Sequence, residues 1–284
     1  MPDHPILVLA ATGGQGRAVC TALLERGAPL RALVRNPNSS GARALAERGA
    51  EIVTGSLDDA NSLAAAMTDV AAVFAMTTPF ESGVDAEIDQ GRTIITAAGR
   101  ARVPHLVFSS VAGADQDSGV PHFESKRVIE ADLRSSGLAH TILGPTYFYD
   151  NALGGEDRIR TEGVLDLPLP PDRPLQQLDR RDLGAFAAHV LLSPESFSGR
   201  RIELASDAPT PEAMAVALTA AIGSPVRFEP VPLGAIDSPD MHAMWWFLNG
   251  PGYRVDLDAL HAEFPDVGWT SFADWATRTF GTAS

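Results

Sequence analysis

The segment Ile6–Gly16 constrains the fold of this chain more than any other. Its apolar beginning predicts a buried strand, and small residues then form a tight turn before a helical pattern over Arg17–Leu24. A strand that turns directly into a helix points the first helical N–H groups at one spot, where the dipole adds roughly half a positive charge. We expect a pyrophosphate, and so a dinucleotide, to bind there; the alternative is a structural turn without a ligand.

Strand and helix patterns alternate along the first half of the chain. The expected strands are continuous apolar runs, typical of strands buried on both faces: Ile6–Ala10, Leu30–Val34, Ala50–Thr54, Val70–Met76, His105–Ser110 and Ala139–Leu143. Amphipathic segments lie between these runs, and Gly27, Gly49 and Gly137 mark expected helix ends. The alternation predicts an α/β protein with a Rossmann-type, doubly wound parallel sheet.

The pattern changes near Asn151. We expect residues 1–150 to form a dinucleotide-binding domain and residues 151–284 a smaller C-terminal α/β lobe for a substrate or partner, interleaved with the first domain through a segment near 180–205. A proline-rich stretch over Gly163–Pro174 predicts a loop or an extended arm. Further helices are expected over Asp182–Leu192 (with Asp182 as N-cap), Thr210–Ile222, Met241–Leu248 and Trp269–Phe280, and strands over Arg201–Ala205 and Val226–Val231.

Composition limits the classes of partner. The net charge of −14, from 22 Lys and Arg against 36 Asp and Glu, opposes direct binding to nucleic acid or anionic membranes. The single cysteine, Cys20, excludes an internal disulfide and favours a packing role, and scattered histidines predict no metal site. With no signal-peptide pattern and no membrane-spanning apolar run, we expect a cytoplasmic protein, monomeric or homodimeric.

The residue after the second expected strand indicates which dinucleotide fits. An Asp or Glu there would bind the ribose hydroxyls of NAD, but this chain has Arg35. A guanidinium can hold a 2′-phosphate through two hydrogen bonds. We therefore expect NADP(H) rather than NAD(H), the alternative being that Arg35 is an ordinary solvated arginine.

Short motifs along nearly the whole chain carry a family resemblance. They are ATGGQG at 11–16, VRNP at 34–37, GSLDD at 55–59, EIDQG at 87–91, VFSS at 107–110, HFESK at 122–126, PTYF at 145–148, DLG at 182–184 and FADW at 272–275. In this order and spacing the chain resembles the NmrA-like family of atypical short-chain dehydrogenases. Two departures are Ala10 at the first glycine position of the loop and Ser56 where the family usually has Asp.

The resemblance implies an NADP-binding Rossmann domain whose smaller C-terminal lobe forms a cleft over the nicotinamide. The residues that it assigns to the cofactor are Ala11, Thr12, Gly13, Gly14, Gln15 and Gly16 at the pyrophosphate loop, Arg35 at the 2′-phosphate, Ser56 and Leu57 at the adenine, Thr77 and Thr78 on the ribose and nicotinamide side, Lys126 at the nicotinamide ribose, and Tyr147, Phe148 and Asn151 around the nicotinamide.

The candidate catalytic residues are Lys126, His122 and Ser110. Broader short-chain reductases place a proton-donating Tyr four residues before a Lys, and that position here holds His122, on the same helix face as Lys126. His122 is either a proton donor near neutral pH or a residue that caps or packs at the helix start. Ser110 either donates to a substrate carbonyl or is a satisfied strand end, and Lys126 is expected at the cofactor rather than in solvent.

Two functions remain open on the sequence. The apolar segment Met241–Leu248 is either core or a hydrophobic wall for a flat substrate. We expect an NAD(P)H-dependent oxidoreductase that passes hydride to a small apolar carbonyl, enone or quinone-like acceptor. The alternative, favoured by the missing tyrosine, is a non-catalytic sensor that reports the NADP(H) state to a protein partner.

Overall fold

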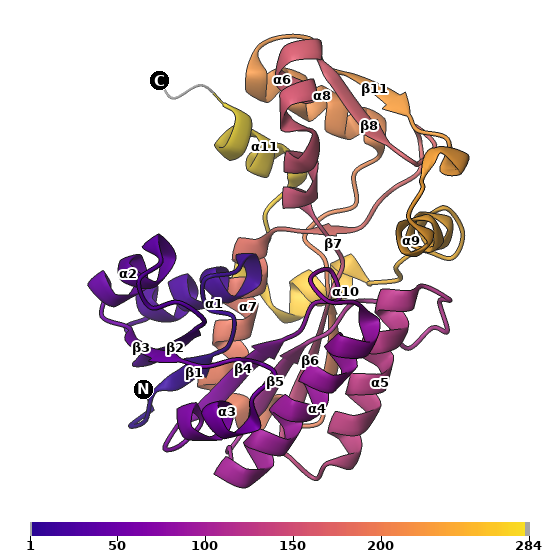
Figure 1. Cartoon of the computed structure of the whole chain (residues 1–284). Coiled ribbons are helices and arrows are strands. Elements are labelled where there is room, and N and C mark those ends of the chain that lie inside the picture. Colours follow the sequence, from indigo (N-terminus) through magenta and orange to yellow (C-terminus); the bar gives the residue numbers. More distant parts are fainter. Residues whose placement is uncertain (1, 282–284) are drawn as a thin grey trace. The chain divides into compact units, whose positions relative to one another are not determined.

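A seven-stranded sheet organises the first of two units in the computed structural model, which describes residues 2–281 (Figure 1). In spatial order the strands are β10 (Arg201–Leu204), β6 (His140–Pro145), β5 (Leu106–Ser109), β4 (Ala72–Met76), β1 (Ile6–Val8), β2 (Leu30–Val34) and β3 (Glu51–Thr54). Neighbouring strands from β6 to β3 run parallel. Sequence order runs outward from β1 in both directions, which confirms the predicted doubly wound sheet.

Helices cover both faces of this sheet. They are α1 (Gly14–Glu25), α2 (Ser40–Glu47), α3 (Ala60–Ala66), α4 (Val84–Ala101), α5 (Pro121–Ser135) and α7 (Arg180–Leu192). In Figure 1, α3, α4 and α5 lie on the face turned to the viewer. None of the helices within residues 2–281 is both long and apolar enough to cross a bilayer.

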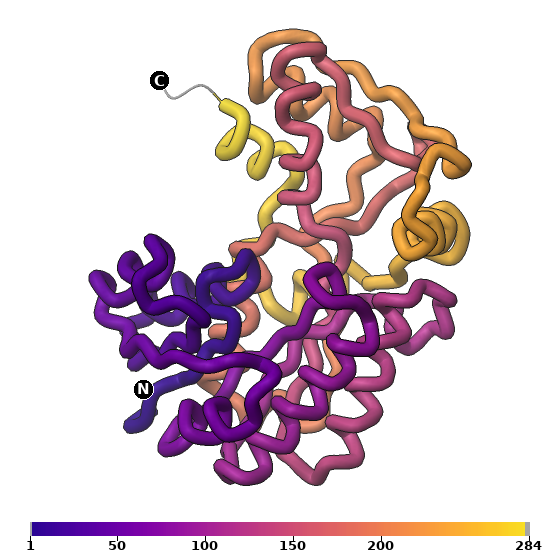
Figure 2. Tube along the Cα trace, viewed as in Figure 1, coloured from indigo at the N-terminus to yellow at the C-terminus, as the bar shows by residue number. Residues whose placement is uncertain are grey.

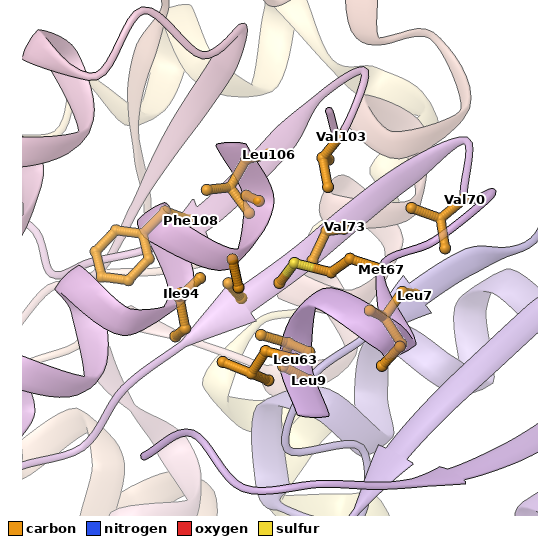
Figure 3. Packing of buried hydrophobic residues seen from close by; sticks show 14 of the residues in the cluster. Leu7, Leu9, Leu63, Met67, Val70, Val73, Ile94, Val103, Leu106 and Phe108 are labelled. Atoms are coloured by element: carbon orange, nitrogen blue, oxygen red, sulfur yellow. The ribbon is translucent and has the colours of Figure 1, made fainter. Parts of the chain in front are cut away.

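The core of the first unit follows from the alternation of side chains along each strand. Leu7 and Leu9 pack with apolar residues of α3, α4 and α5 in one cluster, shown in Figure 3. Ile6 and Val8 point to the opposite face and are also fully buried. Both faces of the sheet are therefore covered, which explains why its strands are continuous apolar runs rather than alternating ones.

A late segment of the chain returns to the first unit. This unit contains the residues up to Asp115, then His122–Gly144 and Leu183–Glu203, and the colours of Figure 2 show how far apart these pieces are in sequence. The return depends on Gly184, because a Cβ there would lie 2.5 Å from the carbonyl oxygen of Ala18 on α1. The helices α1 and α7 can thus approach backbone to backbone.

The second unit is built from shorter elements. Its strands are β7 (Tyr147–Phe148), β8 (Val164–Leu167), β9 (Gln177–Leu178) and β11 (Arg227–Pro230), and its α-helices are α6 (Glu156–Glu162), α8 (Pro211–Ile222), α9 (Pro239–Asn249), α10 (Leu257–Glu263) and α11 (Phe272–Phe280). β7 pairs with β9 and β8 pairs with β11, both in parallel. Short 3₁₀ helices occupy Tyr149–Gly155, Pro194–Ser196, Leu233–Ala235 and Pro265–Val267, of which the second belongs to the first unit.

Local hydrogen bonding refines one expectation for this region and corrects another. The stretch Gly163–Pro174, predicted as a loop or extended arm, begins with the extended strand β8, whose residues Val164, Leu165 and Leu167 are buried and pair with β11. The helix expected to start at Asp182 starts at Arg180, because Asp179 accepts a hydrogen bond from the Arg181 N–H at 2.8 Å. Asp182 is therefore no N-cap: its carboxylate accepts from Thr270 and Ser206 instead.

Candidate functional site

The parallel strands of the first unit bring the predicted site residues of that unit to one edge. The residues that follow β1 to β5 directly are Leu9–Gly13, Arg35, Gly55–Leu57, Thr77–Thr78 and Ser110. Strands of one direction end at the same edge, so these segments gather at the carboxyl edge of the sheet. The crevice beside β1, where the strand order reverses, is where doubly wound sheets bind ligands.

The loop after β1 is shaped by two small residues. Ala10 has a φ of 49°, in the left-handed region that favours glycine, and its carbonyl accepts from the Gly13 N–H at 2.9 Å. A Cβ at Gly16 would lie only 2.3 Å from the Ala10 carbonyl oxygen. Gly16 therefore allows the first turn of α1 to close against the loop.

The beginning of α1 fits a diphosphate. Gly13 precedes the helix in extended conformation and supplies no side-chain cap, and the first turn contains no acidic residue. Its N–H groups thus face outward with the positive end of the dipole, and glycine at 13 and 14 leaves no side chain in the way. The buried Cys20 of α1 contacts the loop, with its Sγ 4.0 Å from the Ala11 carbonyl oxygen. Burial raises the pKa of Cys20 to about 12.

Gln15 ties the start of α1 to the end of β5. The Ser109 hydroxyl donates to Gln15 Oε1 at 2.6 Å, so the amide side chain is turned along the edge of the sheet. Thr12 lies at the opposite side of the loop, against α2, since a Cβ at Gly41 would approach its methyl group at 3.2 Å. The predicted phosphate loop is therefore in contact with the end of β5 on one side, through Gln15, and with α2 on the other, through Thr12.

Arg35 forms an ion pair that the sequence did not predict. Its guanidinium donates to both carboxylate oxygens of Glu81, at 2.9 and 3.3 Å. Both side chains are largely exposed, 77% for Arg35 and 60% for Glu81. Arg35 thus directly follows β2 at the carboxyl edge of the sheet, and its guanidinium already has an acidic partner.

The residues predicted at the adenine have internal contacts of their own. The Ser56 hydroxyl donates to Asp58 Oδ2 at 3.1 Å, and Gln90 donates to the other oxygen of Asp58 at 3.0 Å. Leu57 packs against the core cluster of the first unit. The Ser56 side chain therefore lies beside a carboxylate, that of Asp58.

Lys126 belongs to a buried cluster beneath the end of β4. Its ammonium donates to Thr77 O at 2.7 Å and Thr77 Oγ1 at 2.9 Å, and lies 2.9 Å from Glu87 Oε1. Ser125 donates to the other oxygen of Glu87, whose side chain is fully buried. Burial lowers the pKa of Lys126, and the Glu87 carboxylate opposes that shift. All three ammonium protons thus have acceptors within the first unit.

Ser110 is held by a second buried cluster. Its hydroxyl donates to Glu130 Oε1 at 2.5 Å, and the Glu130 carboxylate also accepts from Arg201 Nε at 3.0 Å and from Arg134 at 2.8 Å. Arg201 further donates to Val111 O at 3.0 Å. The cluster fixes the segment after β5, and the Ser110 proton points at a carboxylate.

His122 lies among aromatic rings in the first turn of α5. Its ring centroid is 5.5 Å from that of Phe80 and 4.8 Å from that of Phe123, and the residue is 9% exposed. Phe80 itself is 70% exposed. His122 and Lys126 lie one turn apart on α5, as the spacing predicted.

Tyr147, Phe148 and Asn151 form a separate group in the second unit. Partial burial raises the pKa of Tyr147 to about 12, an effect that its hydrogen bond with Asn151 opposes. The Tyr147 ring packs on Trp245 of α9 at 5.5 Å between centroids, and the Arg180 guanidinium lies over Phe148 at 5.3 Å. This aromatic pair links Tyr147, a predicted cofactor residue, to the Met241–Leu248 segment.

The sequence did not predict four charged residues that surround the candidate site: Glu81, Glu87, Glu130 and Arg201. Glu87 had a detectable signal, because it is an acidic residue on the apolar face of an amphipathic helix pattern. Glu81 had none, since it is a loop residue whose partner is 46 positions away. Within residues 2–281, no three His, Cys, Asp or Glu side chains are grouped so that they could hold a metal ion.

Comparisons with known proteins identify the family of the chain. The model of the NmrA-like family matches residues 2–246. The NAD(P)H azoreductase of Xenophilus azovorans is 33% identical over 228 residues, which are 80% of this chain and 77% of that protein. The (4-alkanoyl-5-oxo-2,5-dihydrofuran-3-yl)methyl phosphate reductase of Streptomyces griseus is 32% identical over 226 residues, covering 79% of this chain and 76% of that protein.

A solved structure extends the comparison to the whole chain. The NADPH-dependent quinone oxidoreductase of Escherichia coli, complexed with NADPH, is 25% identical and superposes with a TM-score of 0.81. The match covers 97% of this chain and 100% of that one.

Proposed function

The chain belongs to the NmrA-like family, and on that premise we propose that it is an NAD(P)H-dependent oxidoreductase that uses NADP(H). The observation that carries the proposal is the carboxyl edge of the sheet, where an uncapped helix N-terminus and Arg35 lie after neighbouring strands. The first suits a pyrophosphate and the second a 2′-phosphate. Relatives with NAD(P)H or NADPH in their names support the same assignment.

The coenzyme would lie along this edge. The loop at Thr12–Gly16 holds the pyrophosphate, and Ser56 and Leu57 flank the adenine, with Asp58 as a further acceptor for its amino group. Thr77 and Thr78 line the ribose and nicotinamide side. The family resemblance also makes Tyr147, Phe148 and Asn151 proposed contacts of the nicotinamide.

When bound, the reduced nicotinamide supplies hydride to an acceptor held against it. The protein's part is to orient the two and to exclude water. Lys126 fixes the Thr77 backbone through its hydrogen bonds to Thr77 O and Oγ1, so it positions the segment after β4. Two of our candidate catalytic residues donate within the protein, Ser110 to Glu130 and Lys126 to Thr77. We propose that the proton comes from His122 or from water.

The acceptor class follows from chemistry that the relatives' names share. An azo group, a quinone and an unsaturated oxo-dihydrofuran each contain an electron-poor, conjugated double bond. We propose that this chain reduces a small, flat, conjugated acceptor of the carbonyl, enone or quinone kind. The partly exposed Tyr147 ring, which packs on the buried Trp245, is the proposed apolar contact for such a ring.

A turnover assay tests this function. NADPH oxidation is followed by nicotinamide absorbance with quinones, enones, aldehydes and azo dyes, each with and without the protein. We expect turnover with at least one conjugated acceptor. NADPH binding without turnover on any acceptor would contradict the oxidoreductase and favour the sensor that reports the NADP(H) state to a protein partner.

A further inference from the structure

The segment that follows β4 crosses the mouth of the proposed phosphate site. Glu81 comes after β4 and its partner Arg35 comes after β2, while β1 lies between these two strands in the sheet. Adjacent strands are about 4.8 Å apart, so the ion pair bridges roughly 10 Å across the end of β1. The loop that precedes α1 begins at that end.

This segment is anchored at several points. Lys126 holds its first residue through Thr77 O, and the Gly83 N–H donates to Pro79 O at 2.7 Å to close a turn around Glu81. The Phe80 ring rests on His122. Gly83 has a φ of 89°, which permits the sharp entry into α4. Glu81 is therefore held on a tight turn that directs its carboxylate to Arg35.

We infer that Glu81 is a specificity-determining residue for the coenzyme: it competes with the 2′-phosphate for Arg35. The inference rests on the proposed function and adds a residue to it. NADPH must displace one carboxylate to reach the guanidinium, and the carboxylate then remains near a dianionic phosphate and repels it. NADH brings no phosphate to this point, so Glu81 penalises NADPH selectively and limits the preference that Arg35 creates.

The test is the ratio of dissociation constants, Kd(NADH)/Kd(NADPH), measured by calorimetry on the whole chain. If a substitution in the segment after β4 changes the affinity for both coenzymes equally, that change cancels in this ratio. Glu81→Gln keeps the size of the side chain and removes its charge. We expect the ratio to rise about threefold to tenfold, the range for an exposed ion pair plus like-charge repulsion. In an Arg35→Ala background, the same substitution should raise the ratio less, because the competition for the guanidinium is gone and only the repulsion between carboxylate and phosphate remains.

Glu51→Gln is the matched control. Glu51 pairs with Arg31 at 2.8 Å, also in the first unit, but at the beginning of β3 and so at the amino edge of the sheet. Its loss should leave the ratio unchanged. An unchanged or lower ratio in Glu81→Gln would overturn the inference while NADPH binding by the wild type keeps the proposed function. If the wild type binds neither coenzyme, both fail.

Discussion

At the scale of single residues, the proposed phosphate loop depends on conformations that few side chains tolerate. Ala10 adopts a left-handed φ of 49°, which costs a residue with a Cβ about 1 kcal/mol. Gly16 is constrained by space rather than by its backbone angles: its φ is one that any residue can adopt, but a Cβ there would clash with the Ala10 backbone. The glycine pattern in the sequence predicted the loop, whereas the strain at Ala10 depends on backbone angles that no motif reports.

Replacing Ala10 with Gly should stabilise the protein. Gly removes the strain but gains entropy in the unfolded chain, so the net gain should be about 0.5 kcal/mol. Chemical denaturation measures it, with Ala65→Gly as the control: Ala65 lies exposed in α3, where Gly should cost about 1 kcal/mol. Equal losses of stability in both variants would show that Ala10 is not strained.

Replacing Gly16 with Ala should disturb the loop and its ligand together. The added Cβ would lie 2.3 Å from the Ala10 carbonyl oxygen and 2.8 Å from the carbonyl carbon, so backbone must move. We expect a loss of about 1–3 kcal/mol in stability and at least about tenfold in NADPH affinity. Gly99→Ala is the control, because nothing lies within 4 Å of a Cβ there. Tight NADPH binding by Gly16→Ala would place the coenzyme elsewhere.

At the scale of elements, the periodicity of apolar residues predicts strands and helices better than it predicts the side-chain contacts between them. The strand runs from β1 to β6 were predicted to within two residues at either end, because strands buried on both faces have a strong apolar signal. The buried ion pair between α4 and α5 was not predicted. Its residues, Glu87 and Lys126, are far apart in sequence and meet only because both helices pack on one face of the sheet. Short strands such as β7 and β9 have no periodicity to detect.

The contact between α4 and α5 predicts a coupled pair of mutations. Lys126→Met would leave Glu87 fully buried without its counter-charge, which should cost about 3–5 kcal/mol. Adding Glu87→Gln removes that charge and should restore a large part of the lost stability, which a double-mutant cycle in urea would measure. If the two losses simply add, Lys126 and Glu87 do not stabilise each other in the folded protein.

At the scale of the whole molecule, acid should unfold the chain partly through His105. This residue lies just before β5, and burial, then His140, lowers its pKa from 6.5 to about 4, with Glu195 opposing. Thr141 Oγ1 lies 2.8 Å from His105 Nε2 and donates its own proton to Phe197 O. His105 Nε2 therefore carries a proton and donates to Thr141, and the lowered pKa keeps the ring neutral in the folded state above about pH 4.

The pH dependence of stability follows from this shift. Below about pH 6.5 His105 is protonated in the unfolded chain, whereas in the folded chain it stays neutral down to about pH 4. The free energy of unfolding should therefore fall as the pH drops through this window, by about 1–3 kcal/mol. His105→Gln keeps a donor for Thr141 without the titration. Denaturation midpoints at several pH values should be flatter in this variant than in the wild type. Parallel profiles would mean that other groups cause the acid sensitivity.

The sequence predicted the sheet, and the structure places the glycine-containing loop after β1 and Arg35 after β2 at the carboxyl edge of that sheet. These features are local, because each is a strand end followed by a turn. The carboxylates that surround the candidate site, Glu81, Glu87 and Glu130, could not be predicted in the same way. Their partners come from other elements, so their positions depend on how those elements pack.

Calorimetric titration of the wild type and Arg35→Ala with NADPH and NADH tests the central claim most directly. We predict that the wild type binds NADPH more tightly than NADH, and that Arg35→Ala weakens NADPH about 10–100-fold while changing NADH little, as expected for a lost bidentate, charge-assisted contact. Equal weakening of both coenzymes, or no binding of either by the wild type, would contradict the account.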